Sequence, residues 1–203
     1  AQNFTTATST FNTAVGYAAG AAVTTGLQNT LIGGLAGDAL TDADKNVAIG
    51  YGALSTDTLG SRSVAIGTFA LEDQNFTTAT DAYNTAVGNA AGANVTTGLY
   101  NTLIGGLAGD AITTGDHNVT LGVSALTSNT AANKNVAIGS NSLSVFNVTS
   151  DTDTYNTVVG YSAGGAVTTG IQNTIVGGLA GDALTDADYN VAIGIEALSA
   201  DTL

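Results

Sequence analysis

A short pattern, Asn-x-x-[Val/Ile/Leu]-Gly, recurs along the chain of 203 residues, once with Ser in place of Asn, and constrains the fold more than any other feature. The numbers of successive glycines differ by 17, except at two places where they differ by 21, so that four units form a longer super-repeat with a period of 72. Such repeats indicate a solenoid, in which each unit is one coil stacked on the next. Residues 1–203 are therefore predicted to be a single repeat domain with coils centred on Gly16, Gly33, Gly50, Gly67, Gly88, Gly105, Gly122, Gly139, Gly160, Gly177 and Gly194.

The residue before each of these glycines is a large aliphatic one, and two residues before it stands Thr or Val. A period of two is typical of a short strand with one buried face. We therefore expect a strand at this place in each unit and expect its large aliphatic residues to form the structural core: Val15, Ile32, Ile49, Ile66, Val87, Ile104, Leu121, Ile138, Val159, Val176 and Ile193.

A second short segment follows each glycine. Three residues after the glycine comes Ala in ten of the eleven units, with Ser142 the exception. A position that admits only Ala or Ser must pack tightly against the interior, and the glycine itself can take φ > 0 and turn the chain. The sequence thus predicts an all-β fold, a parallel β-solenoid of about 11 coils with two strands and two turns per coil. At ~4.8 Å per coil, the rod would be on the order of 50 Å long.

Composition disfavours several classes of function. The chain has 16 acidic and 3 basic residues and a formal charge of −13, so it should repel a phosphate backbone, and we expect no nucleic-acid partner. Its hydrophobic fraction of 44% is too high for a disordered chain. No apolar run approaches the roughly 20 residues of a membrane-spanning helix, and we expect no direct membrane insertion.

Large apolar residues also occur outside the positions assigned to the core, and several recur once per super-repeat. They are either scattered surface residues or a continuous stripe that another chain covers. We favour the stripe, because one coil buries too little apolar surface to offset its backbone entropy. The expected partners are copies of the same chain, in a homotrimer or a filament, and the stripe would consist of Tyr17, Leu35, Phe69, Leu107, Tyr161 and Leu179.

The repeats resemble those of a known family. NVAIGYGAL, SVAIGTFAL, NVAIGSNSL and NVAIGIEAL resemble the YadA-like head repeats of trimeric autotransporter adhesins, and NTAVGYAAG with TTGLQNTLIGGLAG resembles repeats of bacterial and phage tail-fibre proteins. The resemblance covers all eleven units, although the coils here are longer than the usual adhesin-head repeat. It implies a left-handed β-roll, three chains side by side along a common axis, and a role in attachment outside the cell.

One string resembles a catalytic motif. GYSAG at 160–164 fits G-x-S-x-G, the turn that presents the nucleophilic serine of α/β-hydrolases. The equivalent residues of the two earlier super-repeats are Ala90 and Ala18, so Ser162 replaces an alanine. The single histidine, His117, lies about two and a half coils away, which is on the order of 12 Å along the axis. We expect no catalytic residue and no enzymatic activity.

The acidic turns DADKN and DADYN raise the possibility of a calcium site. They place oxygen ligands at alternate positions, but they lack the sixth-position Gly and twelfth-position Glu of an EF-hand. We favour the alternative, a polar turn whose Asp and Asn side chains bond to nearby backbone amides, and we expect no other cofactor. The calcium candidates are Asp42, Asp44, Asn46, Asp186, Asp188 and Asn190.

The near-constant Asn of each unit, such as Asn12 and Asn29, is expected to stack on its equivalents in an amide ladder. The threonines that follow it recur with a spacing that would suit ice binding, but the period of two is expected to point them inward, which disfavours that function. These residues are Thr13, Thr30, Thr85, Thr102, Thr157 and Thr174.

The sequence therefore predicts a structural or adhesive segment of an extracellular fibre, on a cell surface or a virion, that mediates attachment or acts as a rigid spacer. One alternative is a subunit of a self-assembling extracellular filament, because the cut ends of a solenoid expose unpaired strand edges. A second alternative is a Ca²⁺-dependent or glycan-binding surface module. No feature of the sequence identifies a host-surface, matrix or glycan receptor.

Overall fold

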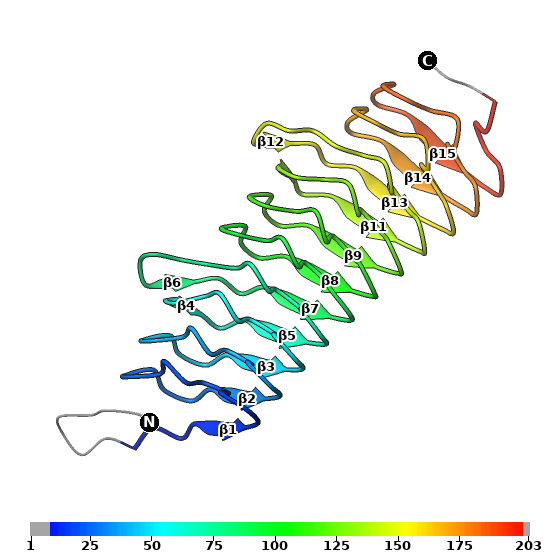
Figure 1. Ribbon diagram of the computed structural model, residues 1–203. Coiled ribbons are helices and arrows are strands. Elements are labelled where there is room, and N and C mark those ends of the chain that lie inside the picture. The colour runs from blue at the N-terminus through cyan, green and yellow to red at the C-terminus, as the bar shows by residue number, and fades with distance from the viewer. Residues whose placement is uncertain (1–8, 201–203) are drawn as a thin grey trace.

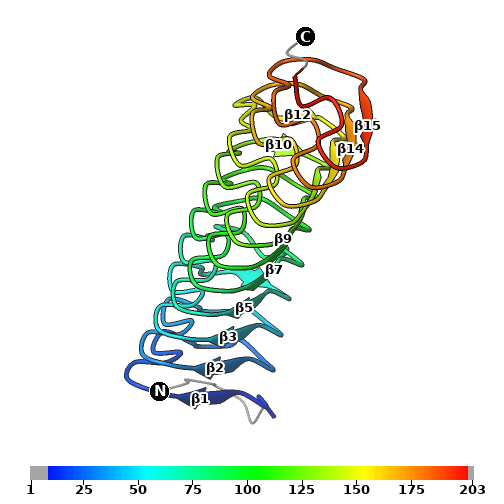
Figure 2. The same ribbon diagram turned by 90° about the vertical axis from the view of Figure 1, so that its right-hand side faces the viewer.

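The computed structural model describes residues 9–200 of the chain. They wind into a stack of coils that forms an elongated rod, with β1 and β15 at its opposite ends (Figure 1). Each coil contributes one short strand, and these strands form an eleven-stranded parallel sheet along one side of the rod (Figure 2). The described residues include no helix. The predicted all-β parallel solenoid is confirmed, and so is its repeat, because each main strand pairs with its equivalent in the next coil.

The strands of the main sheet pair in register, so that Thr13 lies opposite Thr30 and Val15 opposite Ile32. Two further pairs of very short strands occur where the coils are longer. These are β4 (Gly60–Ser61) with β6 (Thr80–Asp81), and β10 (Ala132–Asn133) with β12 (Thr152–Asp153). The main sheet contains β1 (Thr13–Val15), β2 (Thr30–Ile32), β3 (Val47–Ile49), β5 (Val64–Ile66), β7 (Thr85–Val87), β8 (Thr102–Ile104), β9 (Val119–Leu121), β11 (Val136–Ile138), β13 (Thr157–Val159), β14 (Thr174–Val176) and β15 (Val191–Ile193).

The expectation of two strands in every coil is wrong. After each main strand the chain enters a series of turns, and the residue two positions beyond the strand glycine has left-handed backbone angles, as at Leu35 (φ 60°) and Leu107 (φ 57°). A left-handed residue interrupts an extended segment. The turns are nevertheless bonded from coil to coil, for example by the Gly37 N–H, which donates to the Ala53 carbonyl at 2.9 Å.

The strand glycines are required by close stacking as well as by the turn. Gly16 has φ 137°, and a Cβ placed on it would lie 2.4 Å from the carbonyl oxygen of Gly33 in the next coil. The same relationship joins Gly33 to Gly50. Each glycine therefore lets the next coil approach to a distance that a side chain would prevent.

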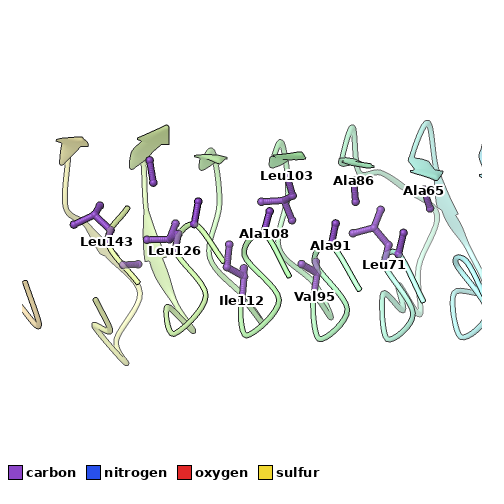
Figure 3. Packing of buried hydrophobic residues seen from close by; sticks show 14 of the residues in the cluster. Ala65, Leu71, Ala86, Ala91, Val95, Leu103, Ala108, Ile112, Leu126 and Leu143 are labelled. Atoms are coloured by element: carbon purple, nitrogen blue, oxygen red, sulfur yellow. The ribbon is translucent and has the colours of Figure 1, made fainter. Parts of the chain in front are cut away.

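The core is narrow and is filled from two sides (Figure 3). From β2 to β15 the middle residue of each main strand is buried and points inward from the sheet. The alanine three residues after the strand glycine packs from the opposite side, as predicted. In several coils a large residue on one side is combined with a small one on the other: Ala65 is combined with Leu71, whereas the larger Leu31 is combined with Gly37. The buried alanines at the predicted position are Ala36, Ala53, Ala70, Ala91, Ala108, Ala125, Ala163 and Ala180, and Ser142 is buried with them.

A ladder of asparagine side chains runs inside the turn before each strand, which confirms the predicted amide ladder. The side-chain oxygen of Asn101 accepts a hydrogen bond from the backbone N–H of Asn118 at 2.9 Å, and its amide donates to the Gly115 carbonyl at 2.8 Å. Ser63 interrupts this series, and the buried Gln74 fills the gap, with its oxygen accepting from the Asn84 amide at 2.9 Å. The ladder thus satisfies buried backbone groups in successive coils.

Candidate assembly surface

The side of the main sheet that faces away from the core is an apolar surface. In a three-residue strand the first and third side chains lie on the opposite face from the second. Because the second residue is buried in every main strand from β2 to β15, the first and third residues point to solvent. We call these outward first and third residues of the eleven main strands the outer face. Val15 is 58% exposed, Leu121 49% and Ile193 68%.

The predicted structural core is therefore wrong. The large aliphatic residues before the glycines belong to the outer face and are exposed or only half-buried, whereas smaller residues such as Ala48 and Ala86 occupy the interior. The reason is that the middle residue of the strand takes the inward place. It is as large as Leu31 where the turn opposite carries Gly37, and it is Ala48 where that turn carries Leu54. The residues concerned are Val15, Ile32, Ile49, Ile66, Val87, Ile104, Leu121, Ile138, Val159, Val176 and Ile193.

The threonines expected to point inward also lie on the outer face. Thr13, Thr30, Thr85, Thr102, Thr157 and Thr174 are the first residues of their strands and are exposed or half-buried. In the remaining five strands Val takes this position. The outer face is thus a regular array of six threonines within a larger number of aliphatic side chains, and none of its residues is charged.

The residues predicted to form an inter-chain stripe lie directly beyond the outer face, one or two positions after the strand glycine. Tyr17 is 84% exposed, Tyr161 62% and Leu107 41%, whereas Leu35, Phe69 and Leu179 are half-buried. These six residues take two different positions of the turn beside the outer face. Between them, the same positions hold small or polar residues such as Gly52 and Ser124, so the six do not form one continuous row.

A second column of side chains, which the sequence analysis did not identify, lies at the other edge of the outer face. It consists of the residue two positions before each main strand, and we call it the entry column. It contains all three Lys and Arg residues of the chain and its one His. The signal was present in the sequence, because the position immediately before the ladder residue holds a long or aromatic side chain in every unit. The members are Phe11, Gln28, Lys45, Arg62, Tyr83, Tyr100, His117, Lys134, Tyr155, Gln172 and Tyr189.

Two ion pairs link the entry column to the short strands of the longer coils. Arg62 Nε lies 2.8 Å from Asp81 Oδ1, and Lys134 pairs with Asp153 in the same way one super-repeat later. The bond from Lys134 and one from the Tyr155 hydroxyl hold the pKa of Asp153 below its ordinary value. Both ion pairs are partly exposed, so solvent screens them and each contributes little to stability.

The residues of the hydrolase-like string do not form a catalytic pair with the histidine. Ser162 lies in the turn after β13, where it has φ 50° and its backbone N–H donates to the Ser140 carbonyl at 2.9 Å. His117 precedes β9 and packs against Tyr100, with ring centroids 4.7 Å apart. Ser162 has the left-handed conformation of the equivalent Ala18 and Ala90 and shares their place in the turn.

The calcium candidates do not converge on one point. Asn46 is fully buried, with its oxygen accepting from the Ser63 N–H and its amide donating to the Gly60 carbonyl. Asp44 Oδ1 accepts from the Leu27 N–H at 2.7 Å in the preceding coil, and Asp188 does the same for Ile171 at 2.8 Å. Between residues 9 and 200, no cluster of three or more His, Cys, Asp or Glu side chains could hold a metal ion.

Comparison with known proteins adds no relative: no family model, no curated protein and no solved structure matches the chain. Among the described residues, no helix has the length and apolar character needed to cross a membrane.

Proposed function

We propose that the chain is a rigid, rod-shaped segment of an extracellular fibre, in which copies of the chain pack side by side through their outer faces. The observation that carries this proposal is the uncharged, mainly aliphatic outer face, which continues over all eleven main strands. Three copies around a common axis would enclose these faces, in agreement with the resemblance of the repeats to trimeric adhesin heads. Attachment to a surface, through a receptor of unspecified kind, is the role that we propose for the fibre.

The size of the outer face supports association. A strip five residues wide, from the first strand residue to the residue after the glycine, measures about 16 Å by about 50 Å, or roughly 800 Å². Beside its aliphatic side chains the strip includes polar ones, among them the six threonines of the outer face, Asn89 and Ser140, so only part of this area is apolar. Monomeric proteins seldom expose a contiguous apolar patch larger than roughly 300–600 Å². A stable interface buries about 800 Å² on each partner, so the strip has the area that one such interface requires.

The charge distribution favours the same surface. Two copies with a net charge of −13 each repel one another wherever their acidic residues meet. The outer face carries no charge and allows approach without burying a carboxylate. We therefore expect association to strengthen as the salt concentration rises, because salt screens the remaining repulsion.

The test is the mass of the protein in solution, measured by light scattering during gel filtration. We expect a trimer for the natural chain and a monomer for Ile104→Arg/Leu121→Arg, because both residues lie mid-rod on the outer face and are 36% and 49% exposed. Thr97→Arg/Thr114→Arg is the matched control, since it adds the same charge at exposed turn positions in the same two coils. A monomeric natural chain, or an unchanged mass for the first variant, would contradict the proposal.

Two other functions have distinct signatures in the same experiments. A self-assembling filament would appear as open-ended fibres in negative-stain images. Ice binding is favoured by one observation, the outward threonines of the outer face, and it requires that face to be free. If the natural chain were a monomer that retards ice growth, and if Ile104→Arg/Leu121→Arg abolished this activity, ice binding would be the better proposal.

A further inference from the structure

The entry column forms a nearly continuous strip of side-chain contacts over six coils. The Arg62 guanidinium lies 5.5 Å from the centroid of the Tyr83 ring, which stacks on Tyr100 with centroids 5.7 Å apart. Tyr100 packs against His117 at 4.7 Å, and the Lys134 ammonium lies 5.2 Å from the Tyr155 ring centroid in the coil after it. At about 4.8 Å per coil, the strip from Arg62 to Tyr155 is roughly 24 Å long.

These residues are held in a conformation that their side chains disfavour. Every member of the entry column has φ between 51° and 64°, in the left-handed region. Gly, Asn and Asp enter that region at the lowest cost, whereas bulky side chains rarely do. None of the eleven positions holds Gly, Asn or Asp. The buried Leu54 and Leu71 share this conformation, so it belongs to the geometry of the coil and fixes the direction in which the entry-column side chains project.

The strip offers the chemistry of a binding site. The centroid separation of Tyr83 and Tyr100 exceeds the ~3.5–4.0 Å of carbon–carbon contact, so the rings are offset. They remain 47% and 45% exposed, and because they stack on each other from one coil to the next, the surface left open to a ligand includes the ring edges and not the stacked faces. Tyrosine combines apolar contact area with a hydrogen-bonding group at a small cost in conformational entropy.

The charges point to a neutral ligand. Arg62 is paired with Asp81 and Lys134 with Asp153, so the two cationic side chains of this part of the strip present donors and acceptors without net charge. The chain as a whole is strongly acidic and repels polyanions. A ligand that is neutral, rich in hydroxyl groups and extended along the rod would match both the composition and the length of the strip.

We propose that the entry column, from Arg62 to Tyr155, binds an extended neutral polysaccharide of β-1,4-linked hexoses that lies parallel to the rod axis. One sugar ring in such a chain advances by nearly the same distance as one coil of the solenoid. Successive rings therefore meet successive side chains in register. This inference adds a ligand-binding site to the proposed fibre. The site lies within one chain and does not require that copies of the chain associate.

The experiment measures the binding of cellohexaose by titration calorimetry. Retention of the protein on amorphous cellulose is measured in parallel. We expect Tyr83→Asn/Tyr100→Asn to lose affinity by roughly tenfold or more, since exposed aromatic anchors dominate binding energy at such surfaces. Asn is compatible with the left-handed backbone, so this variant should fold. Tyr17→Asn/Tyr161→Asn, at the other edge of the outer face, is the control and should bind as the natural chain does.

Several results would overturn this inference. They are failure of the natural chain to bind either glucan, equal loss of binding in the two variants, or tighter binding of the anionic polygalacturonate. Light scattering separates the inference from the proposed function. Tyr83→Asn/Tyr100→Asn should keep the oligomeric mass of the natural chain, and a fall in that mass would assign the entry column to the contact between copies instead.

Discussion

Leu31 and Gly37 share one space inside the second coil: a Cβ on Gly37 would lie 2.7 Å from the Leu31 Cδ2 atom and 2.8 Å from the Leu40 Cδ1 atom. Gly37 also has φ 54°. We expect Gly37→Ala to lower the free energy of unfolding by about 1–3 kcal/mol, through overpacking and backbone strain. Urea denaturation followed by circular dichroism would measure this loss.

Gly178→Ala is the matched control, because Gly178 has no atom within 4 Å of a Cβ among the residues that the structure describes. Its expected effect is within about 0.5 kcal/mol of zero. Leu31→Ala combined with Gly37→Ala should cost less than the sum of the two single changes, since the smaller residue removes the overlap. Additive costs would show that Leu31 and Gly37 do not compete for the same space.

Thr120 stands in the middle of β9, where the equivalent residues of the other super-repeats are Ala48 and Ala192. It is fully buried, and no described residue forms a hydrogen bond with its hydroxyl. We expect Thr120→Val to raise the free energy of unfolding by about 1 kcal/mol, because an unsatisfied buried hydroxyl costs about 1–3 kcal/mol. Thr102→Val, at a half-buried position on the outer face, should show no comparable gain. A destabilised Thr120→Val would argue that the hydroxyl has a partner.

The sequence was sufficient to predict the architecture, because a short, regular repeat with a glycine after each apolar segment has few solutions other than a stack of coils. The inward alanines, such as Ala53 and Ala108, were also predictable from their invariance in size. Which side of each strand faces the core could not be predicted from the sequence. Ile104 and Leu103 are equally apolar, and a period of two fits either parity.

The difference between the two sides of the strand is steric. Whether Leu103 or Ile104 faces inward depends on how much room the turns opposite leave, and Gly109 provides that room only when the coil is closed. The entry column was missed for a related reason. Its members, among them Lys45, Tyr83 and Gln172, share no chemical class, and only their common place in the coil relates them.

Substitution of Asn101 tests how much the asparagine ladder contributes to stability. Asn101 is fully buried, its oxygen accepts from the Asn118 N–H at 2.9 Å, and its amide donates to the Gly115 carbonyl at 2.8 Å. Asn101→Ala would leave both backbone groups buried without a partner, so we expect a loss of about 2–4 kcal/mol in the free energy of unfolding. Asn94→Ala, on the exposed surface, is the control. Equal stability of the two variants would mean that water replaces the amide.

Calcium should not stabilise the protein. Asp44 and Asp188 already bond to backbone amides of the preceding coil, and the side chain of Asn46 is turned into the core. We expect the same melting temperature, within error, in millimolar Ca²⁺ and in excess chelator. A ligand that binds the folded state raises the melting temperature, so a rise in Ca²⁺ that Asp42→Asn/Asp44→Asn abolishes would restore the calcium site.

Asp57 should make stability depend on pH in the direction opposite to most surface carboxylates. It is fully buried, and desolvation raises its pKa above the ordinary 3.8, partly offset by hydrogen bonds from Gln74, Phe76 and Gly60. The folded state therefore takes up this proton at a higher pH than the unfolded state does. The contribution of Asp57 to stability rises as pH falls from the folded pKa to the unfolded pKa, and is constant below it.

Asp57→Asn removes this titration, and the equivalent position in the second super-repeat is naturally Asn129. The measurement is the free energy of unfolding of both proteins in urea, from pH 7 to pH 3. Relative to Asp57→Asn, the natural chain should become more stable as the pH falls. Parallel pH curves for the natural chain and Asp57→Asn would show that hydrogen bonding to the carboxylate fully compensates its burial, because a pKa equal in the two states contributes no pH dependence.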